Sequence, residues 1–228
     1  PASARLADNL QIRLGNALKE NKEGLSKTLD DFKKYILFNF KGLNPEKFTA
    51  AVFKIEGSSS EVQNQMENLK FLAKKHKGIL AGESTGRSGY LATMVIAYIR
   101  ELIFTQNILG ETMETAVPWS KINQVKGEAF KLINELHKEN NLPGKPFFTS
   151  RISKIYHTGV CMYNTIAMSF EGIENPEDVF TRIEHKMREN FIKNGGSISH
   201  HHGVGKLRKD FMSDTISEGS IEMVKGVK

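Results

Sequence analysis

The 228-residue sequence contains a single cysteine, Cys161, so the chain cannot form an intramolecular disulfide. One cysteine in a chain of this size is typical of a reducing compartment. The sequence also lacks an apolar run of about 18 residues, the length that a helix needs to cross a bilayer, and it lacks a signal peptide. It begins at Pro1 rather than at a methionine. We therefore expect a piece of a longer protein, without a transmembrane helix.

Strong charge of one sign is missing as well. The sequence has 32 Lys and Arg against 26 Asp and Glu, a formal net charge of +6 that is spread along the chain. Such a modest positive charge suits anionic substrates or an anionic membrane surface. Proteins that bind single-stranded nucleic acids interleave basic with aromatic residues, and no such stretch occurs here. We expect no nucleic-acid partner.

Nucleotide-binding motifs are absent too. A P-loop places Ser or Thr after its lysine, whereas Lys206 in the glycine-rich C-terminal segment is followed by Leu207. What this segment does contain is three consecutive histidines, His200, His201 and His202. Neighbouring side chains cannot all enter one core. At least one imidazole should therefore face a cleft or solvent, where it can exchange a proton near neutral pH.

Two other interpretations of the histidine segment stay open. A solvated loop without a role would have the same composition. A structural zinc site would need spaced pairs of Cys and His, which this sequence does not have. We therefore expect no metal site.

The remaining pattern predicts an α+β fold. Apolar residues at spacings of three and four indicate helices at residues 22–40, 58–76, 90–102, 120–140, 175–193 and 211–228. Alternating and β-branched stretches indicate strands at residues 48–56, 78–82 and 147–170, with a hairpin at 157–159, and an extended segment at 108–118. The glycine-rich residues 82–89 should form a loop. The order strand, helix, strand suggests a ferredoxin-like antiparallel sheet with helices on one face.

A few polar side chains stand out against apolar surroundings. Tyr163 falls on the strand face with small and polar residues, where a phenol either lines a cavity or is simply half-buried. Arg100 lies near the end of an apolar helix, where it either caps the helix or clamps a phosphate or carboxylate. Glu111 and Glu114 should lie on opposite faces of an extended segment, so we do not expect a paired acid/base set.

Several stretches, in this order, resemble the alkyldihydroxyacetonephosphate synthase family: residues 1–9 (PASARLADN), 97–102 (AYIREL), 109–119 (LGETMETAVPW) and 194–208 (NGGSISHHHGVGKLR). This family of flavoenzymes belongs to the vanillyl-alcohol oxidase superfamily. The resemblance spans the whole chain and implies the cap, or substrate-binding, domain of an FAD-linked oxidase-type protein. It implies a connection from a preceding FAD-binding domain at residues 1–20, the cap domain at 21–194, and a histidine-rich active-site loop with a closing helix at 195–228.

The resemblance also implies a reaction and a setting. In this family, a transferase of ether-lipid (plasmalogen) biosynthesis replaces the acyl chain of acyl-dihydroxyacetone phosphate by a long-chain fatty alcohol. The cofactor is FAD, whose flavin acts as an electrophile without net redox change. The resemblance further implies a peroxisomal location. We also expect contact with a membrane surface, from which the alcohol is delivered, and a homodimer.

The same family pattern assigns catalytic roles. It makes Tyr163 the acid/base residue, and it gives the removal of a substrate proton to one of His200, His201 and His202. Within that segment it points to His201. Residues 163–168 (YNTIAM) depart from the aromatic-rich YFYFAF of family members, so the aromatic setting of Tyr163 and the shape of the lipid tunnel should differ.

The remaining site residues are also implied by the resemblance. Arg100 should bind the substrate phosphate, and Arg5 and His200 should support the active site or the cofactor. Two alternative functions stay open. One is an FAD-dependent 2-hydroxy-acid dehydrogenase of the same superfamily, in which Arg100 would hold a carboxylate. The other is a non-enzymatic module that binds phosphate or lipid.

Overall fold

The computed structural model describes residues 1–17 and 42–227, without the side chains of Ala17, of residues 92–98 and of Arg100. The chain divides into two compact units, Pro1–Ala97 and Tyr98–Lys228. The helix expected at residues 22–40 lies outside the described residues. The domain boundaries expected after residues 20 and 194 stay predictions.

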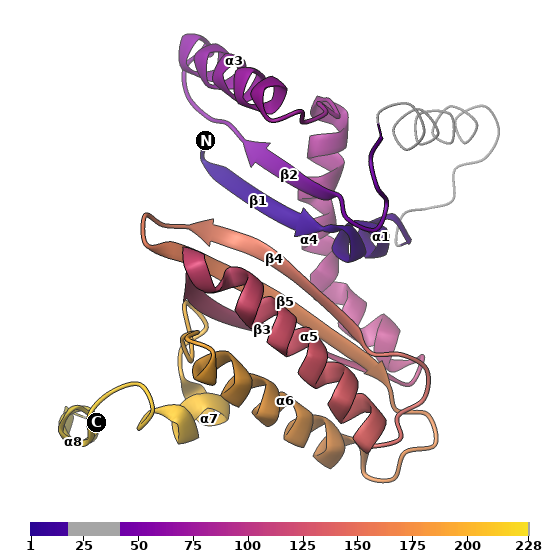
Figure 1. Cartoon of the computed structure of the whole chain (residues 1–228), viewed down its shortest axis with the longest axis vertical. Coiled ribbons are helices and arrows are strands. Elements are labelled where there is room, and N and C mark those ends of the chain that lie inside the picture. Colours follow the sequence, from indigo (N-terminus) through magenta and orange to yellow (C-terminus); the bar gives the residue numbers. More distant parts are fainter. Residues whose placement is uncertain (18–41, 228) are drawn as a thin grey trace. The chain divides into compact units, whose positions relative to one another are not determined.

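In the first unit, strand β1 (Ser3–Asp8) pairs antiparallel with strand β2 (Thr49–Lys54), as Figure 1 shows. Strand β2 lies within the strand expected at residues 48–56. Helix α1 (Asn9–Ala17) follows β1 directly, and the Asp8 carboxylate accepts a hydrogen bond of 3.0 Å from the backbone N–H of Gln11. Asp8 therefore caps the start of this helix.

Helix α3 (Ser59–Lys75) also forms where the sequence predicts a helix. Its N-cap is Ser58, whose backbone N–H donates to the Glu61 carboxylate at 2.8 Å. This reciprocal arrangement of Ser and Glu is a capping box. It confirms that the serine-rich stretch before Glu61 starts the helix.

Two expectations for the following segment are wrong. Residues 78–82 form no strand, and helix α4 (Glu83–Phe104) begins directly after them. Leu80 is 61% exposed, so this short apolar run gains little from pairing in a sheet. The loop expected at residues 82–89 is instead the start of α4. The helix continues back through Gly86 and Gly89 at a cost of about 1 kcal/mol per glycine relative to alanine.

The second unit is built on strands β3 (Ile108–Pro118), β4 (Phe147–Ile155) and β5 (Gly159–Ser169). Strand β5 is central and antiparallel to both neighbours, and Tyr163 pairs with Glu114 of β3 and with Arg151 of β4. The β4–β5 hairpin turns at residues 157–159, as expected. Directly opposed residues lie on the same face of a sheet. These three side chains therefore form one row.

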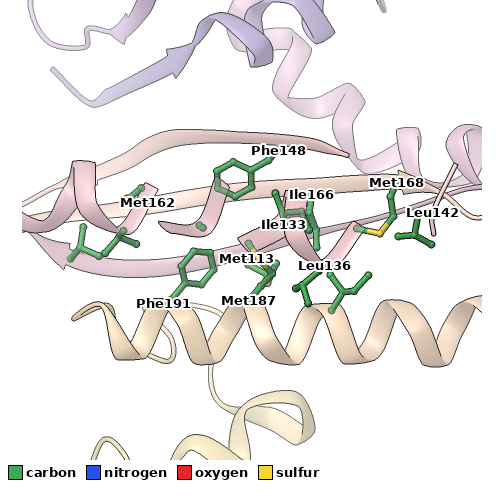
Figure 2. Close-up of a cluster of buried hydrophobic side chains, with 14 of the residues drawn as sticks. Met113, Ile133, Leu136, Leu142, Phe148, Met162, Ile166, Met168, Met187 and Phe191 are labelled. Carbon is green, nitrogen blue, oxygen red and sulfur yellow. The ribbon is translucent and has the colours of Figure 1, made fainter. Parts of the chain in front are cut away.

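Helices α5 (Ile122–Glu139) and α6 (Pro176–Lys193) cover one face of this sheet (Figure 1). A short 3-10 turn, η2 (Trp119–Lys121), leads from β3 into α5. Figure 2 shows the core between sheet and helices, whose buried residues include Met113, Ile133, Leu136, Met162, Ile166, Met187 and Phe191. The prediction of an α+β fold with an antiparallel sheet is confirmed.

The closing helix is shorter than the expected 211–228. Helix α8 (Glu218–Val227) is preceded by two short turns, α7 (Gly205–Arg208) and η3 (Lys209–Phe211). The Ser217 hydroxyl accepts a hydrogen bond of 3.3 Å from the backbone N–H of Ser220. Serine favours such a capping position over a helix interior, which explains why α8 starts here. In the described ranges, no helix combines the length and apolarity needed to cross a bilayer.

Candidate active site

The sheet of the second unit has a polar face, opposite the layer formed by α5 and α6. The strand register places Glu114, Arg151 and Tyr163 on this face. The two-residue periodicity of the strands adds further side chains to it, namely Thr112, Thr149, Cys161 and Thr165. The prediction that Tyr163 lies among small and polar residues is therefore confirmed.

The segment that follows α6 is hydrogen-bonded along strand β3. The backbone N–H of Ser197 donates to the carbonyl of Ala116 at 3.0 Å, and the Ser197 hydroxyl accepts from the N–H of Ala116 at 2.9 Å. At Gly196, a Cβ atom would lie 2.3 Å from the Thr115 hydroxyl oxygen and 2.9 Å from the Phe191 carbonyl oxygen. The lack of a side chain at Gly196 thus permits this close approach, which brings the histidine segment beside Glu114.

Glu114 lies at the centre of the site, and its side chain is 0% exposed. Its Oε1 atom accepts a hydrogen bond of 3.1 Å from the Ser199 hydroxyl. The same oxygen accepts from the backbone N–H groups of His200, His201 and His202 at 2.9, 2.7 and 2.6 Å. Successive N–H groups that converge in this way form an anion-binding concavity. One carboxylate oxygen therefore sets the backbone of the whole histidine segment.

The hydrogen bonds to Glu114 also decide its charge. Burial by itself would raise its pKa, but the backbone N–H groups of His202, His201 and His200 outweigh that effect and lower the pKa to about 2. Glu114 is therefore ionised at neutral pH and can only accept hydrogen bonds. Burial raises the pKa of the nearby Cys161 thiol, so this side chain is neutral at the same pH.

The second carboxylate oxygen of Glu114, Oε2, is in direct contact with Nδ1 of His201. Because an ionised carboxylate cannot donate, Nδ1 of His201 carries a proton, and in the neutral ring the free lone pair is then on Nε2. The two ring nitrogens of His200 lie 2.9 Å from Nδ1 of His201 and 2.7 Å from the Tyr156 hydroxyl. Both nitrogens of His200 are engaged, whereas among the described residues no hydrogen bond occupies Nε2 of His201.

Tyr163 lies against the histidine segment. Its ring stacks on that of His201, with centroids 6.1 Å apart, and meets the ring of His202 edge-on at 5.5 Å. The Arg151 guanidinium lies over the Tyr163 ring, 4.3 Å from its centroid, a cation–π contact. The side chains of His201 and His202 are 40% and 30% exposed. A proton acceptor, a phenol and a cation thus share one accessible surface.

The C-terminal end of the histidine segment is held by Arg208, which is buried. Its guanidinium donates a hydrogen bond of 3.0 Å to the carbonyl of Gly203. Burial and the neighbouring Arg188 lower the pKa of Arg208. The segment is therefore held by a buried anion at its amides and by a buried cation at a carbonyl.

Among the site residues that the sequence predicts, the structure brings together Tyr163 and the histidines at 200–202. Arg5 lies on β1 in the other unit, with its guanidinium 5.4 Å from the centre of the Tyr90 ring. Arg100 lies in α4, and its side chain is outside the described part of the chain. The functional roles of all these residues stay predictions.

The sequence analysis missed the structural roles of Glu114, Arg151 and Tyr156. The backbone amide of His200 that binds Glu114 lies 86 residues away in the sequence, and no local pattern connects the two. Arg151 meets Tyr163 only through the register of β4 and β5. The one available signal was the position of Glu114 inside a stretch that resembles the family.

Side chains with metal-binding atoms also gather here. Ligand atoms of Glu114, Cys161, His200 and His201 lie within 4.8 Å of one another. The hydrogen bonds to Glu114 and its direct contact with His201 already account for this grouping. The expectation that the site holds no metal stays a prediction.

Comparison with known proteins defines the class of this chain. The family model described as FAD linked oxidases, C-terminal domain, matches residues 1–228. The chain therefore belongs to this family, and the expected cofactor, FAD, is supported by the match.

Curated relatives of this chain carry the name of one enzyme. The alkyldihydroxyacetonephosphate synthases of Caenorhabditis elegans, Dictyostelium discoideum and Trypanosoma brucei brucei are 35%, 24% and 25% identical to this chain over its whole length. The chain spans 38%, 37% and 37% of these curated relatives. The family resemblance inferred from the sequence is thus confirmed.

Solved structures agree on the fold. Two crystal structures of alkyldihydroxyacetonephosphate synthase, in P212121 and P1, match with TM-scores of 0.69 and 0.64 at 19% and 20% identity. They cover 94% and 86% of this chain, which corresponds to 39% and 35% of theirs. The expected α+β fold is therefore also that of these solved structures.

Proposed function

We propose that the protein to which this chain belongs is an alkylglycerone-phosphate synthase, and that this chain supplies its acid/base side chains. The observation that carries the proposal is the pairing of His201, held by Glu114, with Tyr163 on an accessible polar face. The names of the relatives support the same activity. The reaction replaces the acyl chain of acyl-dihydroxyacetone phosphate by a fatty alcohol.

His201 takes the substrate proton next to the carbonyl and returns it to the same carbon once the ether bond has formed. Its Nε2 atom has a lone pair because Nδ1 donates to Glu114. His200 suits this role less well, since both its ring nitrogens are in hydrogen bonds. A positioned general base contributes about 10²–10⁴-fold to the rate.

Tyr163 is the acid/base residue for the exchange of the acyl chain for the fatty alcohol. The fatty acid leaves with both of its oxygens as the bond to the substrate carbon breaks, and the oxygen of the alcohol forms the new ether bond. The phenol of Tyr163 donates a proton toward the departing oxygen and accepts the proton of the incoming alcohol. Arg151, over the Tyr163 ring, supplies positive charge near the departing carboxylate.

The rest of the site would hold the cofactor and the phosphate. The partly exposed rings of His202 and Tyr163 suit contact with a flat aromatic cofactor. FAD, when bound, supplies an electrophilic ring to the reaction. Arg100 binds the substrate phosphate, and Arg5 supports the site. Delivery of the alcohol from a membrane surface, a homodimer and a peroxisomal location belong to the same proposal and rest on the family resemblance.

The experiment that tests this function uses the full-length, FAD-loaded protein with acyl-dihydroxyacetone phosphate and labelled hexadecanol. We expect the label in an alkyl ether product, and we expect His201→Ala to lower its formation by about 10²–10⁴-fold. If the wild-type protein forms no ether, the proposed function is wrong. If His201→Ala keeps near-normal turnover, the function stands and the assignment of the base is wrong.

A further inference from the structure

We propose that Glu114 is the positioning residue of this site, with a separate task for each carboxylate oxygen. Oε1 holds the backbone of the histidine segment, and Oε2 fixes the proton of His201 on Nδ1, which leaves Nε2 as the proton acceptor. The arrangement itself stands on the contacts of Glu114. Only the step that Nε2 performs rests on the proposed function.

The task of Oε1 is structural. It accepts from three successive backbone N–H groups and from the Ser199 hydroxyl. Backbone N–H groups that are shielded from water need an acceptor, and these hydrogen bonds are partly buried. A neutral carbonyl oxygen could still accept these hydrogen bonds, although less strongly than a carboxylate.

The task of Oε2 requires a group that accepts and cannot donate. Oε2 contacts Nδ1 of His201, and it lies 3.9 Å from Sγ of Cys161, whose thiol is neutral. An amide NH₂ at the same place would donate to Nδ1 and force the proton onto Nε2. In the Ser-His-Asp triad, the corresponding exchange of Asp for Asn lowers kcat about 10⁴-fold because the histidine is in the wrong tautomer.

Glu114→Gln therefore separates the two tasks, because it keeps an acceptor for the amides and reverses the bond to His201. The matched control is Glu111→Gln, the same exchange three residues earlier on β3. Glu111 lies on the other face of the strand, and its carboxylate accepts from the backbone N–H of Thr112 at 2.6 Å. A general effect of losing a carboxylate from this strand would appear in both variants.

Steady-state kinetics of the full-length, FAD-loaded variants give the first test, with hexadecanol and palmitoyl-dihydroxyacetone phosphate as substrates. We expect Glu114→Gln to lower kcat about 10²–10⁴-fold and to leave the KM for the phosphate substrate within about threefold of the control. A kcat within about threefold of the control would overturn the proposal.

The second test needs no variant of Glu114 and no activity. Nitrogen-15 NMR of the histidine-labelled wild-type protein, with the His201 signals assigned from His201→Asn, reports which ring nitrogen carries the proton at neutral pH. We expect the proton on Nδ1 of His201, and a proton on Nε2 would overturn the proposal. This result decides the role of Glu114 even if Glu114→Gln does not fold. The NMR result also decides the role of Glu114 if the wild-type protein forms no ether and the proposed function fails.

Discussion

At the scale of single residues, the site depends on which nitrogen of each histidine is already engaged. Both ring nitrogens of His200 are in hydrogen bonds, one with the Tyr156 hydroxyl and one with Nδ1 of His201. In His201, Nδ1 contacts Glu114, and within the described residues Nε2 has no such contact. His200 and His201, adjacent in sequence, therefore differ in chemistry. His201 has the contacts of a base, and His200 has the contacts of a support.

A first prediction at this scale concerns Tyr163. Tyr163→Phe keeps the ring that stacks on His201 and lies under Arg151, and it removes only the hydroxyl, which lies 3.2 Å from that of Thr112. We expect ether formation by the full-length protein to fall about 10²–10⁴-fold, with little change in thermal unfolding. Near-normal turnover of this variant would show that another group handles the proton of the alcohol.

A second prediction concerns acid stability and Glu114. Its pKa is about 2 in the folded chain, against an ordinary value of 4.5, so the unfolded chain binds the proton more tightly. The stabilisation that this difference provides is fully present above about pH 5 and is lost as the pH falls toward 2. At 1.36 kcal/mol per pKa unit, it amounts to about 3 kcal/mol.

The measurement is the free energy of unfolding in urea for the wild-type protein and Glu114→Gln, at several pH values between 2 and about 6. We expect the advantage of the wild-type protein to shrink steadily as the pH falls through this window. A difference that does not depend on pH would mean that the carboxylate is not held as an anion.

At the scale of elements, the contact between β3 and the segment after α6 creates the site. Ser197 bonds to Ala116 through its backbone and its side chain, and Gly196 allows this approach. Neither the strand nor the histidine segment carries the site alone. A change at the contact should therefore affect folding and catalysis together.

Gly196→Ala tests this contact. The added Cβ would meet the Thr115 hydroxyl oxygen at 2.3 Å and the Phe191 carbonyl at 2.9 Å, and such overpacking costs about 1–3 kcal/mol. The control is Gly127→Ala in α5, where nothing lies within 4 Å of the new Cβ and the helix gains about 0.5–1 kcal/mol. Chemical unfolding should thus give opposite signs for the two variants, and equal effects would argue against a tight contact at Gly196.

The sequence predicted elements well where periodicity is strong. The alternation along β5 and the apolar spacing in α5 and α6 identified all three elements. Prediction failed at residues 78–89, where the apolar and glycine residues favour no single local structure. The helix that continues beyond these residues determines the conformation of residues 83–89. The site shows the same limit, because Tyr163 and the histidines were visible as residue types while the link through Glu114 depends on tertiary contact.

At the scale of the whole molecule, the chain covers 38% of its Caenorhabditis elegans relative. Under the proposed function, it contributes the base, the phenol and the phosphate-binding arginine, and FAD is held mainly by sequence outside this chain. Under the same proposal, the full-length protein exchanges an acyl chain for an alkyl chain without net oxidation or reduction.

The most direct measurement is an anaerobic assay of the full-length, FAD-loaded protein with palmitoyl-dihydroxyacetone phosphate and hexadecanol, in the absence of any electron acceptor. Ether product and released palmitate are quantified together over many turnovers. Equal amounts of both are the predicted result. The absence of ether, together with bleaching of the flavin by a 2-hydroxy acid such as D-lactate, would contradict the proposed function and identify a dehydrogenase.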